Sequence, residues 1–299
     1  MNRRTLIMLA LGAALLAAGC ATVARVGTQV AQGSGAITED QAGSINRTTD
    51  ALEKTFQDIT PEQEHYIGRA VAADILASYK PADRQSFDAY LNTLGQTLAL
   101  ASNRPETFGG WHLLLLDSDE INAFAAPGGL ILVTKGLVRC CASEDELAAV
   151  LAHEIAHVQN RDGLKAIKKS RLTAALATIG VETARQLGDQ QIRDLAGQLE
   201  GSVHDITQTL VNNGYARGLE FQADRDAVVI LERLGYDPSA LVRMLDTMGK
   251  RVKPGGPGFA HTHPSPADRI AEVKPEAVAM SGGEPSLRAQ RFAAAMAGL

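Results

Sequence analysis

The chain has 299 residues, of which 45% are hydrophobic, so it can form one large domain or two small ones. Its formal net charge at pH 7 is −5, and no basic run or cluster of basic and aromatic residues occurs, which excludes a nucleic-acid-binding protein. Aromatic residues are scarce whereas alanine, leucine and glutamine are common, and this composition predicts a mainly helical protein.

The first residues, MNRRTLIMLALGAALLAAGC, have the pattern of an export signal. Two arginines precede an apolar stretch that ends at Ala18, and this stretch is too short for a stable membrane span. The ending LLAAGC resembles the signal of bacterial lipoproteins, so residues 1–19 are predicted to be removed and Cys20 to carry lipid. The position three before the cysteine is Ala17 rather than the usual large aliphatic residue, and an ordinary cleaved signal is the alternative.

The predicted lipid anchor implies a location. It would hold the chain at a membrane of the bacterial cell envelope, with the folded part facing the periplasm. Ala21 after the cysteine resembles lipoproteins that are sorted to the outer membrane, which is therefore the expected membrane. Residues 20–40 are small and polar with several glycines, and they are predicted to tether a single domain over residues 41–299.

Three helices are predicted at the start of this domain, over residues 41–58, 61–79 and 83–101. Pro61 and Pro81 lie at or near helix starts, where the missing N–H of proline costs no hydrogen bond. The sequence NRPETFGG then breaks the helical pattern, so the third helix is expected to end before it.

Residues 111–138 form the one region with a convincing β pattern. Two apolar runs flank the segment INAFA, and the sequence PGG supplies a turn. Short strands are predicted over residues 111–117, 121–126 and 130–134, and together they are expected to form a small antiparallel or mixed sheet. The predicted fold class is therefore mainly α with a small sheet (α+β).

Residues 143–163 give the clearest helix pattern. Ser143 and Glu146 make a capping box, and Gly163 is expected to end the helix. A helical insert is predicted over residues 164–213, and its charged residues exclude a membrane hairpin. Further helices are predicted over residues 217–235, 238–252, 265–279 and 286–297.

The clearest helix carries the sequence LAHEIAHVQN, in which His153 and His157 are four residues apart. Residues at this spacing share one face of a helix, so both imidazole rings can reach one metal ion. This HExxH pattern predicts two zinc ligands with Glu154 as the general base. Glu154 falls within the apolar stripe of the helix, where a carboxylate is costly to bury unless it has a partner or a task. A pair of ordinary core histidines is the alternative.

A third metal ligand is expected on a later helix. The sequence GLEFQADRDAV supplies Glu220 and, one turn further on, Asp224. Glu220 can bind the metal, and Asp224 can accept a hydrogen bond from the second nitrogen of a ligand histidine. A solvated acidic face is the alternative, although apolar residues surround both acids. Cys140 and Cys141 lack the CxxC spacing of a cysteine metal site and are interpreted as partly buried thiols, or as thiols that could oxidise in the envelope.

Four motifs of the chain resemble those of one protease family. HEIAH and GLEFQAD resemble its HExxH and GxExxAD pair, INAFAAPGG resembles its NAFxxPGG segment, and THPSPADRI resembles its THPxxxxRI segment. The motifs occur in the family's order. The family is that of the gluzincin metallopeptidases that include HtpX, the CAAX prenyl protease, the mitochondrial Oma-type proteases and BepA. Because an export signal is the one predicted membrane segment, the chain is most like the lipid-anchored periplasmic members.

The resemblance implies a zincin-like metalloprotease domain that holds one zinc ion per chain. It implies three zinc ligands, which are His153, His157 and Glu220. It further implies that Glu154 is the catalytic base and that Asp224 is the acid that orients a ligand histidine.

The other two motifs concern the substrate. The resemblance implies that substrate binds along a strand that contains Asn122, Ala123, Phe124 and Ala125. His263 and Arg269 match the final motif. A donor to the developing oxyanion is also needed, and His263, Tyr215 and Arg217 are the candidates. The loop 252–268 has glycines that allow it to move, and one hypothesis is that His263 shields the open zinc position at rest and moves toward the oxyanion when substrate enters. A rigid turn packed beside the site is the alternative.

The implied function is a zinc-dependent endopeptidase for unfolded or misassembled envelope proteins, acting in protein quality control at the bacterial membrane. Its polypeptide substrates would bind as an added strand along residues 121–126, because backbone pairing gives affinity with little sequence preference. The rival function is a chaperone-like binding protein for outer-membrane proteins, with restrained or minor protease activity. A purely structural zinc site is disfavoured, because it would leave Glu154 without a task.

Overall fold

A computed structural model describes residues 59–166, 203–251, 262–279, 286–297 and 299. The chain divides into two compact units after Thr60, and every element given below belongs to the second, Pro61–Leu299. Several predicted features lie outside the described residues: the export signal with Cys20, the tether 20–40, the helix 41–58, most of the insert 164–213 and most of the loop 252–268.

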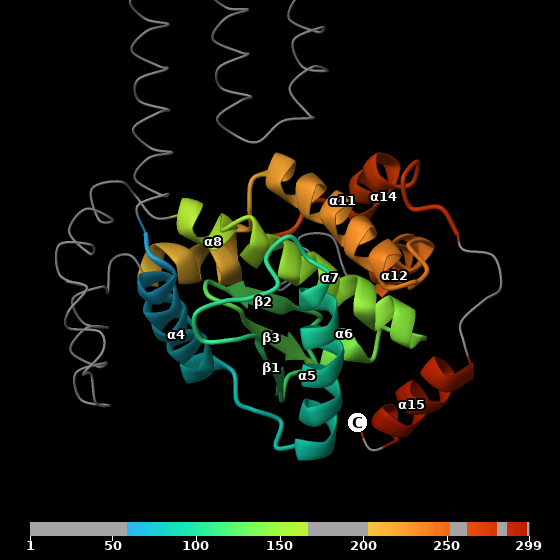
Figure 1. Cartoon of the computed structure of the whole chain (residues 1–299), viewed down its shortest axis with the longest axis horizontal. Helices are drawn as coiled ribbons and strands as arrows, with labels where there is room; N and C mark the ends of the chain where they lie inside the picture. The colour runs from blue at the N-terminus through green and yellow to red at the C-terminus, as the bar shows by residue number, and fades with distance from the viewer. Residues whose placement is uncertain (1–58, 167–202, 252–261, 280–285, 298) are drawn as a thin grey trace, which may run out of the picture. The chain divides into compact units, whose positions relative to one another are not determined.

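Helices make up most of the described chain, and the strands form one small sheet (Figure 1). The N-terminal helices are α4 (Pro61–Ser78) and α5 (Gln85–Leu100). The strands are β1 (His112–Leu116), β2 (Ala123–Ala126) and β3 (Leu130–Thr134). The remaining helical elements are α6 (Lys135–Val138), α7 (Glu144–Gln159), α8 (Asp162–Lys165), the π-helical turn η2 (Thr209–Asn213), α11 (Arg217–Arg233), α12 (Ser239–Arg251), α14 (Pro266–Val273) and α15 (Ser286–Met296). The predicted α+β fold class is confirmed.

The three-stranded sheet is mixed, with the strand order β1-β3-β2. β1 and β3 are parallel, whereas β2 and β3 are antiparallel and pair Phe124 with Leu132. The tight connection between β2 and β3 needs left-handed backbone at Gly128 (φ 78°) and Gly129 (φ 97°), which explains the PGG sequence there. Because β3 lies between the other two strands, β2 is at one edge of the sheet.

Helix α7 lies at the centre of the fold, between the sheet and the pair α11 and α12 (Figure 1). Its start is fixed locally, because Ser143 Oγ accepts a hydrogen bond from the N–H of Glu146 at 3.2 Å. The Glu146 carboxylate in turn accepts one from the N–H of Ala142 at 2.7 Å. Almost the whole of α7 is buried, so its polar side chains lie within the core.

The predicted end of this helix at Gly163 is wrong. α7 ends at Gln159, and Arg161 adopts the left-handed conformation (φ 57°), which turns the chain into the short helix α8. Left-handed backbone is uncommon for a residue other than glycine. Arg161 is held there by a tertiary contact, since its Nε lies 3.1 Å from the buried Glu64 of α4. Gly163 falls inside α8.

Glu64 also connects other parts of the fold. It accepts two hydrogen bonds from Arg104, at 2.7 and 2.9 Å, and one from the N–H of Gly128 at 3.2 Å. A buried carboxylate of this kind is tolerated because it is paired with cations and hydrogen-bonded. The contact fixes α4 against the β2–β3 turn.

Cys140 and Cys141 are buried free thiols. Cys141 packs against α12, where its Sγ lies 3.9 Å from Sδ of Met244. Burial raises the pKa of the Cys141 thiol well above its usual value. Within the described residues, no helix has both the length and the apolar character needed to cross a membrane.

Candidate metal centre

The two histidines of the HEIAH sequence face each other across one turn of α7. Nε2 of His157 lies 3.1 Å from Nε2 of His153, and both side chains are almost fully buried. The rings are nearly perpendicular, with their centroids 4.7 Å apart. The i, i+4 spacing therefore brings two imidazole nitrogens to one point, as the sequence predicts.

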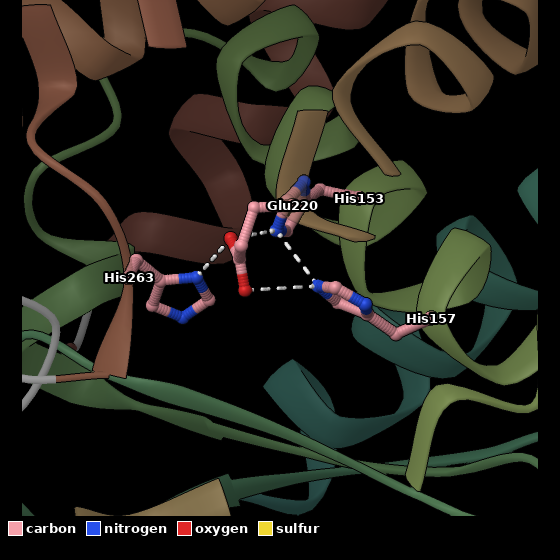
Figure 2. A group of neighbouring side chains, drawn as sticks. All are labelled: His153, His157, Glu220 and His263. Carbon is pink, nitrogen blue, oxygen red and sulfur yellow. Dashed lines mark hydrogen bonds and ion pairs between the residues drawn. The ribbon is translucent and has the colours of Figure 1, made fainter. Parts of the chain in front are cut away.

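Glu220 reaches the same point from the first turn of α11, which packs along α7 (Figure 2). One carboxylate oxygen lies 3.5 Å from Nε2 of His153, and the other lies 3.6 Å from Nε2 of His157. The Glu220 side chain has no exposed surface. The structure thus brings together the three predicted metal ligands.

The donor set fits a zinc ion. Nitrogen and oxygen ligands bind zinc at 2.0–2.2 Å, which places tetrahedral ligand atoms about 3.3 Å apart. Here the two ring nitrogens lie 3.1 Å apart, and the Glu220 oxygens lie 3.5 and 3.6 Å from them. Oε1 of Glu220 is buried and makes no hydrogen bond. A buried acceptor of this kind is costly unless a cation satisfies it.

The charges of the site also favour a cation. Burial opposes ionisation of Glu220, but His263, His153 and His157 outweigh it and hold the Glu220 pKa well below its usual value. Burial and Arg269 lower the pKa of His153, but Asp224 and Glu220 outweigh them and raise it to about 9. Both directions mean that positive charge is stabilised between these side chains.

Asp224 lies behind His153, as predicted. Its Oδ1 is 3.0 Å from Nδ1 of His153, the nitrogen that does not face Glu220. Arg269 donates two hydrogen bonds to the same carboxylate, from Nε and Nη2, at 2.8 and 2.5 Å. Burial raises the pKa of Asp224, but Arg269 and His153 more than offset it and lower the pKa to about 2. Asp224 therefore stays ionised and can orient the imidazole.

Arg269 is buried, and its guanidinium fork is turned toward Asp224. Its Nη2 also lies 3.1 Å from Nδ1 of His153. The hydrogen bonds of Arg269 join it to Asp224 and to the ligand His153, and its predicted contact with substrate stays a prediction. Arg269 connects α14 to α11 and α7 beneath the site.

A support for the second histidine was missed in the sequence. Oδ2 of Asp162 lies 2.9 Å from Nδ1 of His157, and the Asp162 side chain is fully buried. In a continuous helix, a residue five positions further on would lie on another face. The turn at Arg161 brings Asp162 back to His157. Each ligand histidine therefore has its own carboxylate on the nitrogen that faces away from the metal site.

His263 lies on the other side of Glu220 (Figure 2). Its Nδ1 is 2.6 Å from Oε2 of Glu220, and its side chain is only 7% exposed. His263, His153, His157 and Glu220 each offer one ligand atom, and these atoms all lie within 4.8 Å of one another. Burial lowers the pKa of His263. A fourth candidate ligand is therefore present in the site.

The segment that carries His263 is closely packed against Gly214. A side chain at Gly214 would place its Cβ 1.9 Å from the carbonyl oxygen of Thr262, and Gly214 has left-handed backbone (φ 70°). Thr262 is itself buried. The close backbone approach therefore helps to hold His263 beside the metal site.

Glu154 follows His153 on α7 and is buried, and it lines two cavities that Ala123 of the edge strand also lines. One of them is also lined by His157, Tyr215 and His263. The Tyr215 ring stacks on His157 with 4.5 Å between centroids, and its buried hydroxyl makes no hydrogen bond. Arg217, by contrast, is exposed and pairs with Asp268 at 3.2 Å. Of the three candidate oxyanion donors, the structure brings His263 and Tyr215 to this cavity.

The predicted substrate strand is β2, and its residues are buried. Among the described residues, β3 is its one strand neighbour, so its other edge has no strand partner. In an antiparallel pair, alternate residues point their backbone groups away from the partner strand. Asn122 uses its side chain within the protein, accepting from the N–H of Ala123 at 3.0 Å and donating to Glu120 at 3.2 Å.

The chain is similar to known peptidases. The profile of peptidase family M48 matches residues 85–277. The chain is 33% identical over 187 residues to the beta-barrel assembly-enhancing protease of Yersinia pestis, covering 62% of this chain and 38% of that relative. It is 26% identical over 230 residues to the mitochondrial metalloendopeptidase OMA1 of Schizosaccharomyces pombe, covering 74% and 63% of the two chains. A protease HtpX homolog of Acaryochloris marina is 29% identical over 213 residues, covering 60% and 70%. The chain thus spans well under half the length of the first of these relatives.

Proposed function

The chain belongs to peptidase family M48, and from this premise we propose that it is a zinc-dependent endopeptidase of the bacterial cell envelope. One observation carries the proposal. Two histidine nitrogens and the Glu220 carboxylate converge at 3.1–3.6 Å in the core, and Glu154 lies beside them on α7. Three protein ligands and a neighbouring carboxylate are typical of a catalytic zinc site.

Each side chain of the site has a separate role in the proposed hydrolysis. Bound zinc would supply a Lewis acid that polarises the scissile carbonyl and makes water a better nucleophile near neutral pH. Glu154 accepts the proton of the attacking water and passes it to the leaving amine. Asp224 and Asp162 hold the rings of His153 and His157 in place through Nδ1. Tyr215 and His263 line the cavity beside Glu154, where a donor can stabilise the developing oxyanion.

The proposed substrates are unfolded or misassembled polypeptides of the envelope. The edge of β2 that has no strand partner among the described residues can accept an extended chain as an added strand, and Ala123 lines a cavity together with Glu154. Relatives named beta-barrel assembly-enhancing protease support outer-membrane proteins as the substrate class. The LLAAGC sequence supports an anchor at Cys20 that holds the enzyme in the outer membrane, facing the periplasm.

Two variants test the proposal. Glu154→Gln should keep one zinc per chain and lose about 10²–10⁴-fold of casein cleavage, because it removes the proton acceptor without removing a ligand. His157→Ala should lose both zinc and cleavage. Glu232→Gln is the matched control, since this glutamate is exposed on α11, and it should behave as wild type. Zinc content by elemental analysis and cleavage with and without a chelator are the measurements. Full zinc retention by His157→Ala would refute the ligand assignment.

A chaperone-like binding protein is the second candidate, and the closed state of the site favours it. Glu154 is only 4% exposed and His263 lies against Glu220, so polypeptide has little access in this conformation. Outer-membrane protein assembly in cells that carry Glu154→Gln separates the two functions. An endopeptidase function predicts a defect, whereas a binding function predicts assembly as in wild type.

A further inference from the structure

A second cavity shares Ala123 and Glu154 with the cavity that contains Tyr215 and His263, and no step above uses it. Three of its lining residues, His153, Glu154 and Ala123, belong to the metal site and to the edge strand. Its volume is about 20 Å³, enough for a single water-sized group. The remaining lining side chains are almost all apolar and come chiefly from α12: Leu137, Val150, Leu241, Met244, Leu245, Met248 and Arg269.

The position of this cavity follows from two helices. Val150 and Glu154 are four residues apart on α7, so the cavity runs along the helix face that carries the carboxylate. α12 packs across α7 and presents Met244 and Met248 to the same space. The cavity therefore begins at the proposed general base and extends into an apolar part of the core.

A chain on the edge of β2 would pass close to this cavity. Ala123 and Glu154 line both this cavity and the one that contains Tyr215 and His263. In an extended chain, successive side chains point to opposite sides, so one side chain next to the scissile bond can point into the cavity. Its neighbours along the chain would point elsewhere.

We propose that this cavity is the subsite for the substrate side chain next to the scissile bond, and that Met244 and Met248 make it select a small apolar residue. The inference rests on the proposed endopeptidase function. Both methionines are almost fully buried, and together with Leu241 and Leu245 they fill the space that a longer side chain would need. Methionine has a flexible, unbranched side chain, so larger apolar groups enter only when it changes rotamer.

The charges around the cavity disfavour ionised side chains. Glu154 in the lining repels a substrate carboxylate. Arg269 is the one cation in the lining, and its fork is already engaged by Asp224 at 2.8 and 2.5 Å. A substrate lysine or arginine would have to bury its charge between the Met244 and Met248 side chains, which is costly without a partner.

The test uses the zinc-loaded full chain and a peptide series that varies a single residue on one side of the scissile bond, among Ala, Val, Leu, Phe, Asp and Lys. Wild type should cleave the Ala and Val peptides at least about 10-fold faster, in kcat/KM, than the Asp and Lys peptides. Met248→Ala should raise kcat/KM for the Leu and Phe peptides about 10-fold relative to Ala, because it enlarges the cavity. Met248→Leu keeps the volume and should retain the wild-type ranking.

Equal cleavage of all six peptides by wild type, or an unchanged ranking in Met248→Ala, would overturn the subsite. A second measurement keeps this outcome apart from failure of the proposed function. Peptide hydroxamates with a methyl, isobutyl or carboxymethyl side chain are titrated calorimetrically into the zinc-loaded chain. If no peptide is cleaved, the endopeptidase proposal fails, while tighter binding of the methyl than of the carboxymethyl compound still supports the subsite. Equal affinities would overturn the subsite as well.

Discussion

Nδ1 of His263 lies 2.6 Å from Oε2 of Glu220, so the C-terminal THPSPADRI motif directly contacts a proposed metal ligand. His263 also lines the cavity beside Glu154. The close packing of Thr262 on Gly214 holds this histidine in place. In the observed conformation His263 therefore shares a cavity with the proposed general base.

We expect His263→Ala to raise the basal cleavage of a short peptide, because it removes a side chain that shields the site at rest. If His263 is instead the oxyanion donor, the same change should lower kcat by about 10²–10³-fold. A quenched fluorescent peptide, which needs little loop opening, gives the readout. His204→Ala is the control, since His204 is exposed and separate from the metal cluster. If peptide turnover and zinc affinity both match wild type, both roles of His263 are ruled out.

Asp224→Asn should weaken zinc binding by about 10–100-fold in Kd, because it removes the charged acceptor that orients His153. The variant also leaves the buried Arg269 without its ionic partner, so a lower Tm is expected. Competition with a chromogenic chelator measures Kd on protein shown to be folded by circular dichroism. Asp226→Asn is the matched control on the same helix, where the carboxylate bonds to Asn160 and Gln222. Equal Kd values for the two variants would contradict the orienting role of Asp224.

Asp162→Asn tests the corresponding support of His157. Asn can still accept a hydrogen bond from Nδ1, but it lacks the charge that makes the imidazole a stronger ligand. We expect zinc Kd to rise by about 10-fold, at the lower end of the range for such partners. Lys165 also pairs with Asp162, at 2.7 Å, so Lys165→Gln separates the two contacts. A rise in Kd for Lys165→Gln as large as for Asp162→Asn would show that the effect comes from α8 and not from His157.

Cys20→Ala should move the exported protein from the membrane to the soluble fraction, because the predicted lipid would be lost. One acyl chain binds a membrane only marginally, whereas several chains give a stable anchor. Membrane fractionation of cells gives the answer. Cys140→Ala is the control, since Cys140 is buried in the fold and should leave the distribution unchanged. If Cys20→Ala stays on the membrane as wild type does, a plain cleaved signal becomes the better interpretation.

Features that depend on short-range geometry were predictable from the sequence. The i, i+4 spacing placed His153 and His157 on one face of α7, and the Ser143–Glu146 pair marked its start. The three strands were found within two residues of their predicted bounds, because apolar runs and the PGG turn act locally. The choice of Glu220 as the third ligand needed the motif resemblance as well, since short-range sequence patterns do not show how close Glu220 lies to α7.

Other parts of the site depend on contacts between residues far apart in the chain. The end of α7 was misplaced because Arg161 takes up left-handed backbone that its pairing with Glu64, on α4, helps to stabilise. Because of that turn, Asp162 reaches His157. Helical periodicity does not predict this contact. The pairing of Arg269 with Asp224 likewise joins two helices that are far apart in the chain. Periodicity shows which face of a helix a side chain occupies. The partner of that side chain depends on how the helices pack. A buried charge needs a counter-charge, and only the packing of the helices brings the counter-charge near.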